Sequence, residues 1–197
     1  MKNTFLVLSL LLVSSSVSAA VVTFDPASFL GSSGRIETYE ENGVIFSGAF
    51  AHTDTGLAGN PDNGTAFIQY MDYSSMNFGM SNGSLFNLNS IDIAELNMNY
   101  SMPATVTFIG YRPGSVVVSQ SFTIDGLIGA GSDFQTFFFD AGFQGIQYAY
   151  IDVMPKDQIG VYSFDNVNIQ AVPLPAAAWL FMSGMVGLLR FGQRRKK

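Results

Sequence analysis

The sequence predicts an all-β protein, an antiparallel two-sheet β-sandwich of the jelly-roll type seen in galactose-binding and lectin-like domains. Stretches rich in β-branched and aromatic residues recur about every 8 to 12 residues. Pairs that favour tight turns, such as Asn42-Gly43 and Asp125-Gly126, separate them. No helical period is sustained, and only 12% of the residues are charged while 14% are aromatic, which suits short strands.

Ten segments have the composition expected of strands. Apolar and polar residues alternate clearly in Thr105-Val106-Thr107-Phe108, so that each kind would face one side of a sheet. The run Phe137-Phe138-Phe139 has no polar alternate, so its strand is either central and covered on both sides or exposes one phenylalanine in a binding face. The predicted strands are 21–24, 43–50, 65–71, 76–80, 90–96, 104–111, 115–124, 134–140, 146–153 and 161–169.

The N-terminal segment, residues 1–20, has the layout of a cleavable secretion signal. Lys2 precedes an apolar run from Phe5 to Val13, and small residues follow as far as Ala19 and Ala20. The apolar run is too short to span a bilayer comfortably. We therefore expect signal peptidase to cut after Ala19 or Ala20.

The C-terminal segment, residues 171–197, combines a proline motif, an apolar run to Leu189 and a basic cluster. This order predicts a transmembrane helix with its C-terminus in the cytoplasm and the preceding body outside. As a helix, residues 176–189 would rise about 21 Å, less than the roughly 30 Å hydrocarbon core. The motif is Val172, Pro173, Leu174, Pro175 and Ala176, and the cluster ends in Arg194, Arg195, Lys196 and Lys197.

In these features the tail resembles the PEP-CTERM sorting signal in its VPLPA variant. The resemblance implies that a membrane-embedded exosortase processes the tail near the proline motif. It further implies release of the body to the cell surface or exopolysaccharide matrix of a Gram-negative bacterium. An ordinary single-pass anchor that is never cut is the alternative, against which the shortness of the helix argues.

Residues 21–170 form one predicted body domain with a strongly acidic charge. It contains three basic residues, Arg35, Arg112 and Lys156, and all fifteen acidic residues, which gives a net charge of −12. Such a body is unsuited to nucleic acid or anionic lipid, and it is compatible with cations or neutral sugars. The chain has no cysteine, which excludes disulfides, thiolate metal sites and a cysteine nucleophile.

No catalytic residue is predicted. The single histidine, His52, lies in a polar loop, and no Gly-x-Ser-x-Gly elbow presents a serine to it. One histidine is also too few for a histidine-based zinc site. A glycoside hydrolase needs only two carboxylates at a set separation, so a secreted polysaccharide-acting hydrolase remains an alternative without named residues.

Structural calcium suits the acidic oxygens of the body, because Ca²⁺ takes six to eight hard ligands. One candidate group lies in a loop and contains Asp54, Asn60, Asp62 and Asn63. The other combines Asp165 and Asn166 with Glu40 or Glu41 across the sheet. The segments 38–46 and 162–167 resemble the edges of body domains common in proteins with this tail, whose first and last strands often lie adjacent. Solvated turn residues are the alternative for both groups.

Sugar binding is the remaining chemistry that the composition favours. Aromatic rings stack on apolar sugar faces while amides and carboxylates bind the hydroxyls. The sequence therefore indicates a non-catalytic surface or matrix protein associated with exopolysaccharide, or a purely structural and adhesive protein. The candidate rings are Tyr70, Tyr73, Tyr100, Tyr111, Tyr148 and Tyr150, of which we expect one or two to be exposed.

Overall fold

The computed structural model describes residues 19–25, 35–53, 59–70, 76–96, 102–128, 133–152, 162–173, 181 and 184–185. One compact unit covers Ser18–Val172 and holds every described strand. Within the described residues, no helix has the length and apolar character needed to cross a membrane. The predicted secretion signal up to residue 18 and most of the predicted transmembrane helix lie outside these residues.

In the described part of the chain, the body has eleven strands and one short 3-10 helix. The strands are β1 (Ala19–Val22), β2 (Arg35–Glu41), β3 (Val44–Thr53), β4 (Phe67–Tyr70), β5 (Asn77–Met80), β6 (Phe86–Glu95), β7 (Ala104–Arg112), β8 (Val116–Ile124), β9 (Gln135–Phe138), β10 (Tyr148–Asp152) and β11 (Tyr162–Ala171). The 3-10 helix η2 spans Ala141–Phe143.

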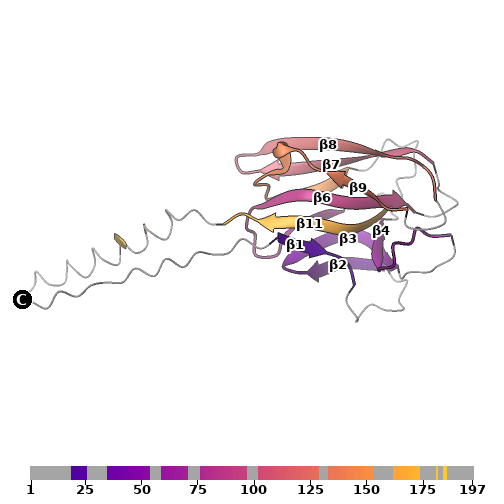
Figure 1. Cartoon of the computed structure of the whole chain (residues 1–197). Coiled ribbons are helices and arrows are strands. Elements are labelled where there is room, and N and C mark those ends of the chain that lie inside the picture. The colour runs from indigo at the N-terminus through magenta and orange to yellow at the C-terminus, as the bar shows by residue number, and fades with distance from the viewer. Residues whose placement is uncertain are drawn as a thin grey trace, which may run out of the picture. The chain divides into compact units, whose positions relative to one another are not determined.

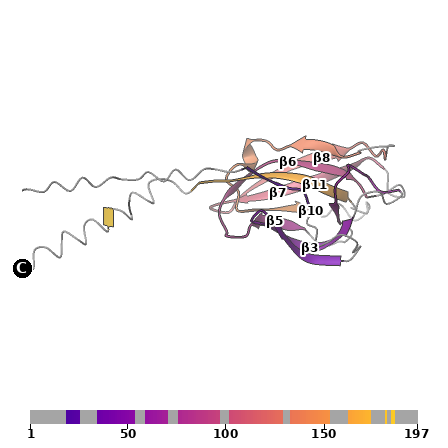
Figure 2. The same cartoon turned by 60° about the horizontal axis from the view of Figure 1, so that its bottom comes forward.

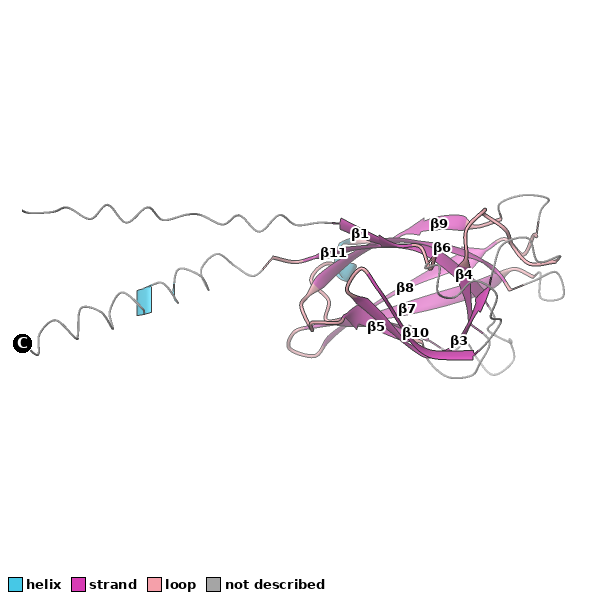
Figure 3. Cartoon of the chain, turned by 90° about the horizontal axis from the view of Figure 1, so that it is seen from below, coloured by secondary structure: helices cyan, strands magenta, loops and turns pink. Residues whose placement is uncertain are grey.

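The strands form one antiparallel hydrogen-bonded path that folds into two layers (Figure 1). The path runs β8-β7-β10-β5-β3-β4-β11-β6-β9, with β2 added to β3 and β1 added to β11. We call β8, β7, β10, β5, β3 and β2 the first layer, and β4, β11, β6, β9 and β1 the second (Figures 2 and 3). The prediction of an all-β antiparallel sandwich is confirmed. Strand β1 lies beside β11, whereas the segment 38–46 falls in β2 and β3, which do not pair with β11 in the described residues.

Strand β3 turns the corner between the layers. Its first half pairs with β5 and its second half with β4. Between the register pairs Ile36↔Phe50 and Thr38↔Ser47, β3 carries one more residue than β2. Gly48 lies in this bulge with φ 141°, a backbone conformation that favours glycine. Bulges of this kind let a strand pass from one sheet of a sandwich to the other.

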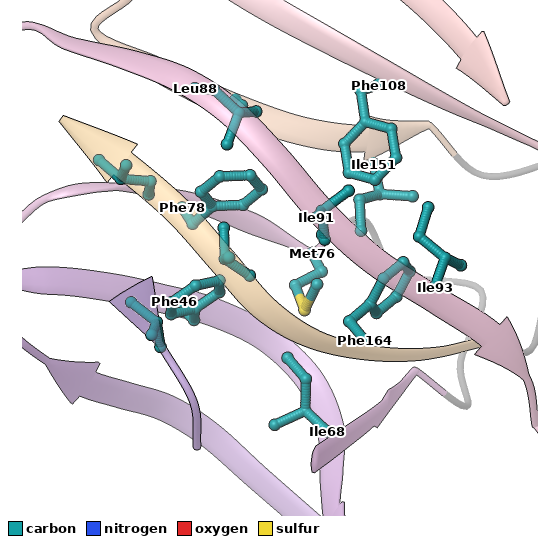
Figure 4. Close-up of a cluster of buried hydrophobic side chains, with 14 of the residues drawn as sticks. Phe46, Ile68, Met76, Phe78, Leu88, Ile91, Ile93, Phe108, Ile151 and Phe164 are labelled. Carbon is teal, nitrogen blue, oxygen red and sulfur yellow. The ribbon is translucent and has the colours of Figure 1, made fainter. Parts of the chain in front are cut away.

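The core between the layers is dominated by phenylalanine (Figure 4). Phe46 and Phe78 of the first layer stack on each other with ring centroids 5.1 Å apart. Phe108 of the first layer meets Phe164 of the second edge to face at 6.3 Å. Buried aromatic pairs of this sort contribute about 0.5–1.5 kcal/mol each beyond their buried area.

The predicted strands are largely confirmed, with two differences. Strand β2 was not predicted, because most of its residues around Tyr39 are charged or polar. Tyr39 is its main apolar residue in the core. Strand β9 is not central but pairs only with β6 at one end of the path. Phe137 and Phe139 pack against the core and Phe138 is 72% exposed, so this run does expose one phenylalanine; a binding role for it is untested.

The side chain of Gln120 joins the two ends of the path. Its Nε2 donates to the Phe138 carbonyl at 3.0 Å, and its Oε1 accepts from the Asp140 amide at 2.9 Å. One side chain in β8 therefore satisfies a donor and an acceptor next to β9. This bridge protects edges that would otherwise be open to pairing with other chains.

Candidate functional site

Three of the six candidate tyrosines lie together on the outer face of the first layer. Tyr148 and Tyr150 are two residues apart in β10, so they point to the same side of the sheet. Tyr111 of β7 is the register partner of Tyr148, and Asn77 of β5 is the register partner of Tyr150. We call these four residues the tyrosine face.

The rings of the tyrosine face stack on one another. Tyr111 and Tyr148 have centroids 4.4 Å apart and an interplanar angle of 16°. Tyr111 and Tyr150 are 5.8 Å apart at 27°. The four residues line an open pocket of about 420 Å³. Near-parallel stacking fixes the orientation of the rings, so their apolar surfaces and hydroxyl groups are presented without the entropy cost of ordering them on binding.

The alternation of β10 explains why these tyrosines face solvent. Ala149 lies between the two tyrosines and Ile151 follows Tyr150. Both are fully buried in the phenylalanine-rich core. Tyr148 is 43% exposed. A tyrosine side chain is stable at the boundary between the core and solvent, because its hydroxyl end stays in water.

An aromatic cluster with one amide at its edge suits sugar binding. The ring surfaces offer apolar contact to the C–H faces of a pyranose, while the Asn77 amide can both donate to and accept from hydroxyl groups. The described lining of the pocket contains no charged side chain. The described lining therefore offers binding chemistry and no carboxylate pair for hydrolysis.

The other candidate residues do not join this face. Tyr73 and Tyr100 lie outside the described residues, as do the side chains of Tyr70 and His52. Asn77 was missed, because a single asparagine at the start of a four-residue strand carries no signal of its own. Only the register between β5 and β10 reveals it.

A second polar cluster fills a gap along the edge of β11. Strand β4 pairs with β11 at residues 162–164 and β1 pairs with it at 167–170, which leaves the edge unpaired around Asp165. Asp165 is fully buried there and accepts hydrogen bonds from Asn63 Nδ2 at 2.5 Å, Thr65 Oγ1 at 2.8 Å and the Asn166 amide at 2.7 Å. Nearby, Asp25 Oδ1 accepts from the amide of Ala66 at 2.7 Å.

The residues predicted to bind calcium are divided among several places. Asn63 lies against Asp165, so one member of each predicted group meets the other. Asn166 donates to Asp92 at 2.8 Å instead, and Glu41 accepts from the Phe24 amide at 2.9 Å.

The remaining members of the predicted calcium groups lie apart. Glu40 is exposed, Asp62 accepts from the Gly64 amide at 2.9 Å, and Asp54 lies outside the described residues. No three acidic, histidine or cysteine side chains of the described part are grouped to hold a metal ion. Calcium binding stays a prediction, which calcium titration followed by thermal unfolding tests.

Burial changes the titration of this second cluster. It raises the pKa of Asp165 to about 6, although the hydrogen bonds from Asn63 and Thr65 act in the opposite direction. Burial and the hydrogen bond to Glu41 raise the pKa of Tyr39 well above its usual value. Burial is the largest cause of both shifts.

The processing residues lie at the ends of the paired first and last strands. Ala19 and Ala20 belong to β1 and pair with Gln170 and Ile169. The Val172 amide, directly after β11, donates to the Leu85 carbonyl at 2.8 Å. Pro173 is exposed, whereas Leu174, Pro175, Ala176 and the basic residues Arg194, Arg195, Lys196 and Lys197 lie outside the described residues. Cleavage and sorting at these positions stay predictions.

Comparison with solved structures finds low similarity to several carbohydrate-binding modules. A family 29 module is 11% identical, with 78% of this chain and 91% of that chain covered and a TM-score of 0.35. The family 11 module of Clostridium thermocellum, in complex with a β-1,3-1,4-mixed-linked tetrasaccharide, is 12% identical, with 81% and 99% covered and a TM-score of 0.37.

A two-module structure is also similar in part. It contains the CBM22-1 and GH10 modules of endo-1,4-β-D-xylanase 10B from Clostridium thermocellum. The sequence identity is 14% and the TM-score is 0.38. The match covers 70% of this chain and 28% of that chain. These identities and TM-scores are too low to transfer a ligand or a residue role. No protein-family model matches the sequence, and no curated protein is significantly similar to it.

Proposed function

We propose that this chain is an exported, non-catalytic jelly-roll protein that binds extracellular polysaccharide through the tyrosine face. The observation that carries the proposal is the convergence of Tyr111, Tyr148 and Tyr150 with Asn77 around one open pocket. Three stacked rings with an amide at their edge match what a sugar chain offers, which is apolar ring faces edged by hydroxyl groups.

Binding of the purified protein to soluble polysaccharides tests this function. We expect Tyr148→Ala to weaken binding at least tenfold, about 1.4 kcal/mol, because the ring contributes contact area and holds Tyr111 in place. Phe138→Ala is the matched control, since Phe138 is an exposed aromatic residue on the other layer and should be neutral. Equal losses in both variants, or no binding by the parent protein, would reject the tyrosine face as the site.

The delivery route that we propose follows from the two ends of the sequence. Signal peptidase cuts after Ala19 or Ala20, and an exosortase processes the tail near the proline motif. The protein then reaches the cell surface or extracellular matrix. The fold is compatible with this route: the motif starts as β11 ends, so a cut within it leaves β11 intact, and the buried Val22 and Phe24 follow both signal cleavage positions.

Mass spectrometry of the native protein in separate cell fractions tests the route. We expect a mature form that begins at Ala20 or Val21, lacks the basic tail and is recovered from the surface or the medium. Recovery of the intact tail from the cytosolic fraction would contradict the proposal.

A further inference from the structure

Two register rows cross the first layer through the tyrosine face. Paired residues of antiparallel strands point to the same side of a sheet, so both rows lie on its outer face. Neighbouring strands are about 4.8 Å apart, which makes each row about 24 Å long. From β8 to β2 the first row is Ser119, Ile109, Tyr150, Asn77, Ser47 and Thr38. The second is Val117, Tyr111, Tyr148, Gly79, Ile45 and Glu40.

Polar side chains beyond the pocket differ between the two directions. Farther along β7 and β8 than the tyrosines, the hydroxyl groups bond to each other in pairs across these two strands: Thr107 with Ser121 at 2.8 Å, and Thr105 with Thr123 at 3.2 Å. In the first row, which crosses the strands, the side chains of Asn77, Ser47 and Thr38 form no hydrogen bond with another described residue. Polar groups that could contact a ligand therefore continue across the strands from the tyrosines, toward Ser47 and Thr38.

The two rows carry almost no charge. Glu40 at one end is their only charged member. Arg112 follows Tyr111 in β7, and the alternation of the strand directs its side chain to the opposite side of the sheet. The body as a whole has three basic and fifteen acidic residues. A polyanion would thus be repelled by the body and would meet no cationic side chain in either row.

The rows point to the class and the direction of the ligand. Resting on the proposed function, we infer that the ligand is an uncharged glycan chain that lies across the strands of the first layer. Its sugar units extend from the stacked tyrosines past Asn77 to Ser47 and Thr38. A long chain then binds more tightly than a short one, because additional units reach side chains that the first units do not touch.

Charge selection is tested with the purified full-length chain and named polysaccharides. The neutral probes are mixed-linked β-glucan, xylan and galactomannan, and the acidic probes are alginate and polygalacturonate. At low salt we expect the best neutral probe to bind at least tenfold more tightly than either acidic one. Raising the salt concentration should leave neutral binding within twofold and should weaken the repulsion of the acidic probes. Tightest binding to an acidic probe would overturn the inference.

Direction is tested with fragments of two and six units from the best neutral probe. We expect the six-unit fragment to bind at least tenfold more tightly. Ser47→Leu should remove most of this gain and leave the two-unit fragment unchanged. Ser121→Leu, the same change placed along the strand direction, should have no effect. Equal affinity for both fragments, or a loss caused by Ser121→Leu instead, would overturn the inference.

The same measurements separate this inference from the proposed function. If no probe binds, or if Tyr148→Ala leaves binding intact, the proposed function fails and the inference fails with it. If binding depends on Tyr148 but favours an acidic probe or ignores fragment length, only the inference fails. Thermal unfolding of Ser47→Leu and Ser121→Leu confirms that both variants are folded.

Discussion

On the outer face of β6, β9 and β11, polar side chains bond to one another across the strands. Asn89 donates to Asn168 at 3.1 Å, and Asp92 accepts from both Asn166 at 2.8 Å and Thr136 at 2.6 Å. We call this the amide face. On the outer face of β5, β7 and β10, the tyrosine rings stack on one another, but the Asn77 side chain has no described partner.

The comparison separates two uses of the same kinds of side chain. Groups that satisfy one another stabilise the fold and leave little for a ligand, whereas rigid groups without partners are available for binding. Substitutions on the second layer should therefore change stability without changing glycan affinity. Substitutions on the tyrosine face should do the reverse.

The largest expected effect belongs to Asp165, which is fully buried on β11 directly before Asn166 of the amide face. Its pKa is about 6 in the folded protein and near 3.8 when unfolded. Between these values the folded state binds more protons, so acidification stabilises it and stability falls as the pH rises. The expected loss from pH 4 to 6 is about 2 kcal/mol.

Denaturant unfolding at several pH values, with a chelator present, measures this loss. Asp165→Asn removes the titrating group and should flatten that part of the profile, while other carboxylates titrate equally in both proteins. Glycan affinity should not follow the same curve, because Asp165 does not line the pocket. Parallel stability profiles for the parent and the variant would contradict the assignment.

The fold was more predictable from the sequence than the site was. Strand alternation, as in Thr105 to Phe108, reports the burial of each residue directly, so most strands could be located. Strand β2 escaped because its inward residues include Glu41, whose carboxylate binds Tyr39 and the Phe24 amide instead of solvent. A local sequence pattern does not show that a charged side chain finds hydrogen-bond partners in a distant segment.

The candidate sites depended on register between distant strands. Three of the six candidate tyrosines lie on the tyrosine face, but only the pairing of β7 with β10 shows that Tyr111 and Tyr148 meet. Similarly, Asn63 and Asp165 were assigned to different calcium groups because nothing local indicates that the loop before β4 packs on β11. Register follows from the packing of the whole core, which a single segment does not specify.

Asp92→Ala tests the amide face with the next largest effect. The substitution leaves Asn166 and Thr136 without their shared acceptor, so we expect the free energy of unfolding to fall by about 1–2 kcal/mol. Asp92→Asn keeps one acceptor oxygen and should recover part of this loss. Glycan affinity should stay within twofold in both variants. A tenfold loss of affinity with unchanged stability would place the ligand on the amide face instead.

The smallest stability effect, and the sharpest test of the comparison, is expected for Tyr148→Phe. The ring remains to stack on Tyr111, and a partly exposed hydroxyl group contributes little, so the free energy of unfolding should change by less than about 0.5 kcal/mol. If the hydroxyl group binds sugar, affinity should still fall about three- to tenfold, the effect of one lost hydrogen bond. Calorimetric titration and thermal unfolding of the same samples measure both quantities. An unchanged affinity would show that Tyr148 acts only through its ring surface, while a large loss of stability would mean that its hydroxyl group serves the fold, as the polar groups of the amide face do.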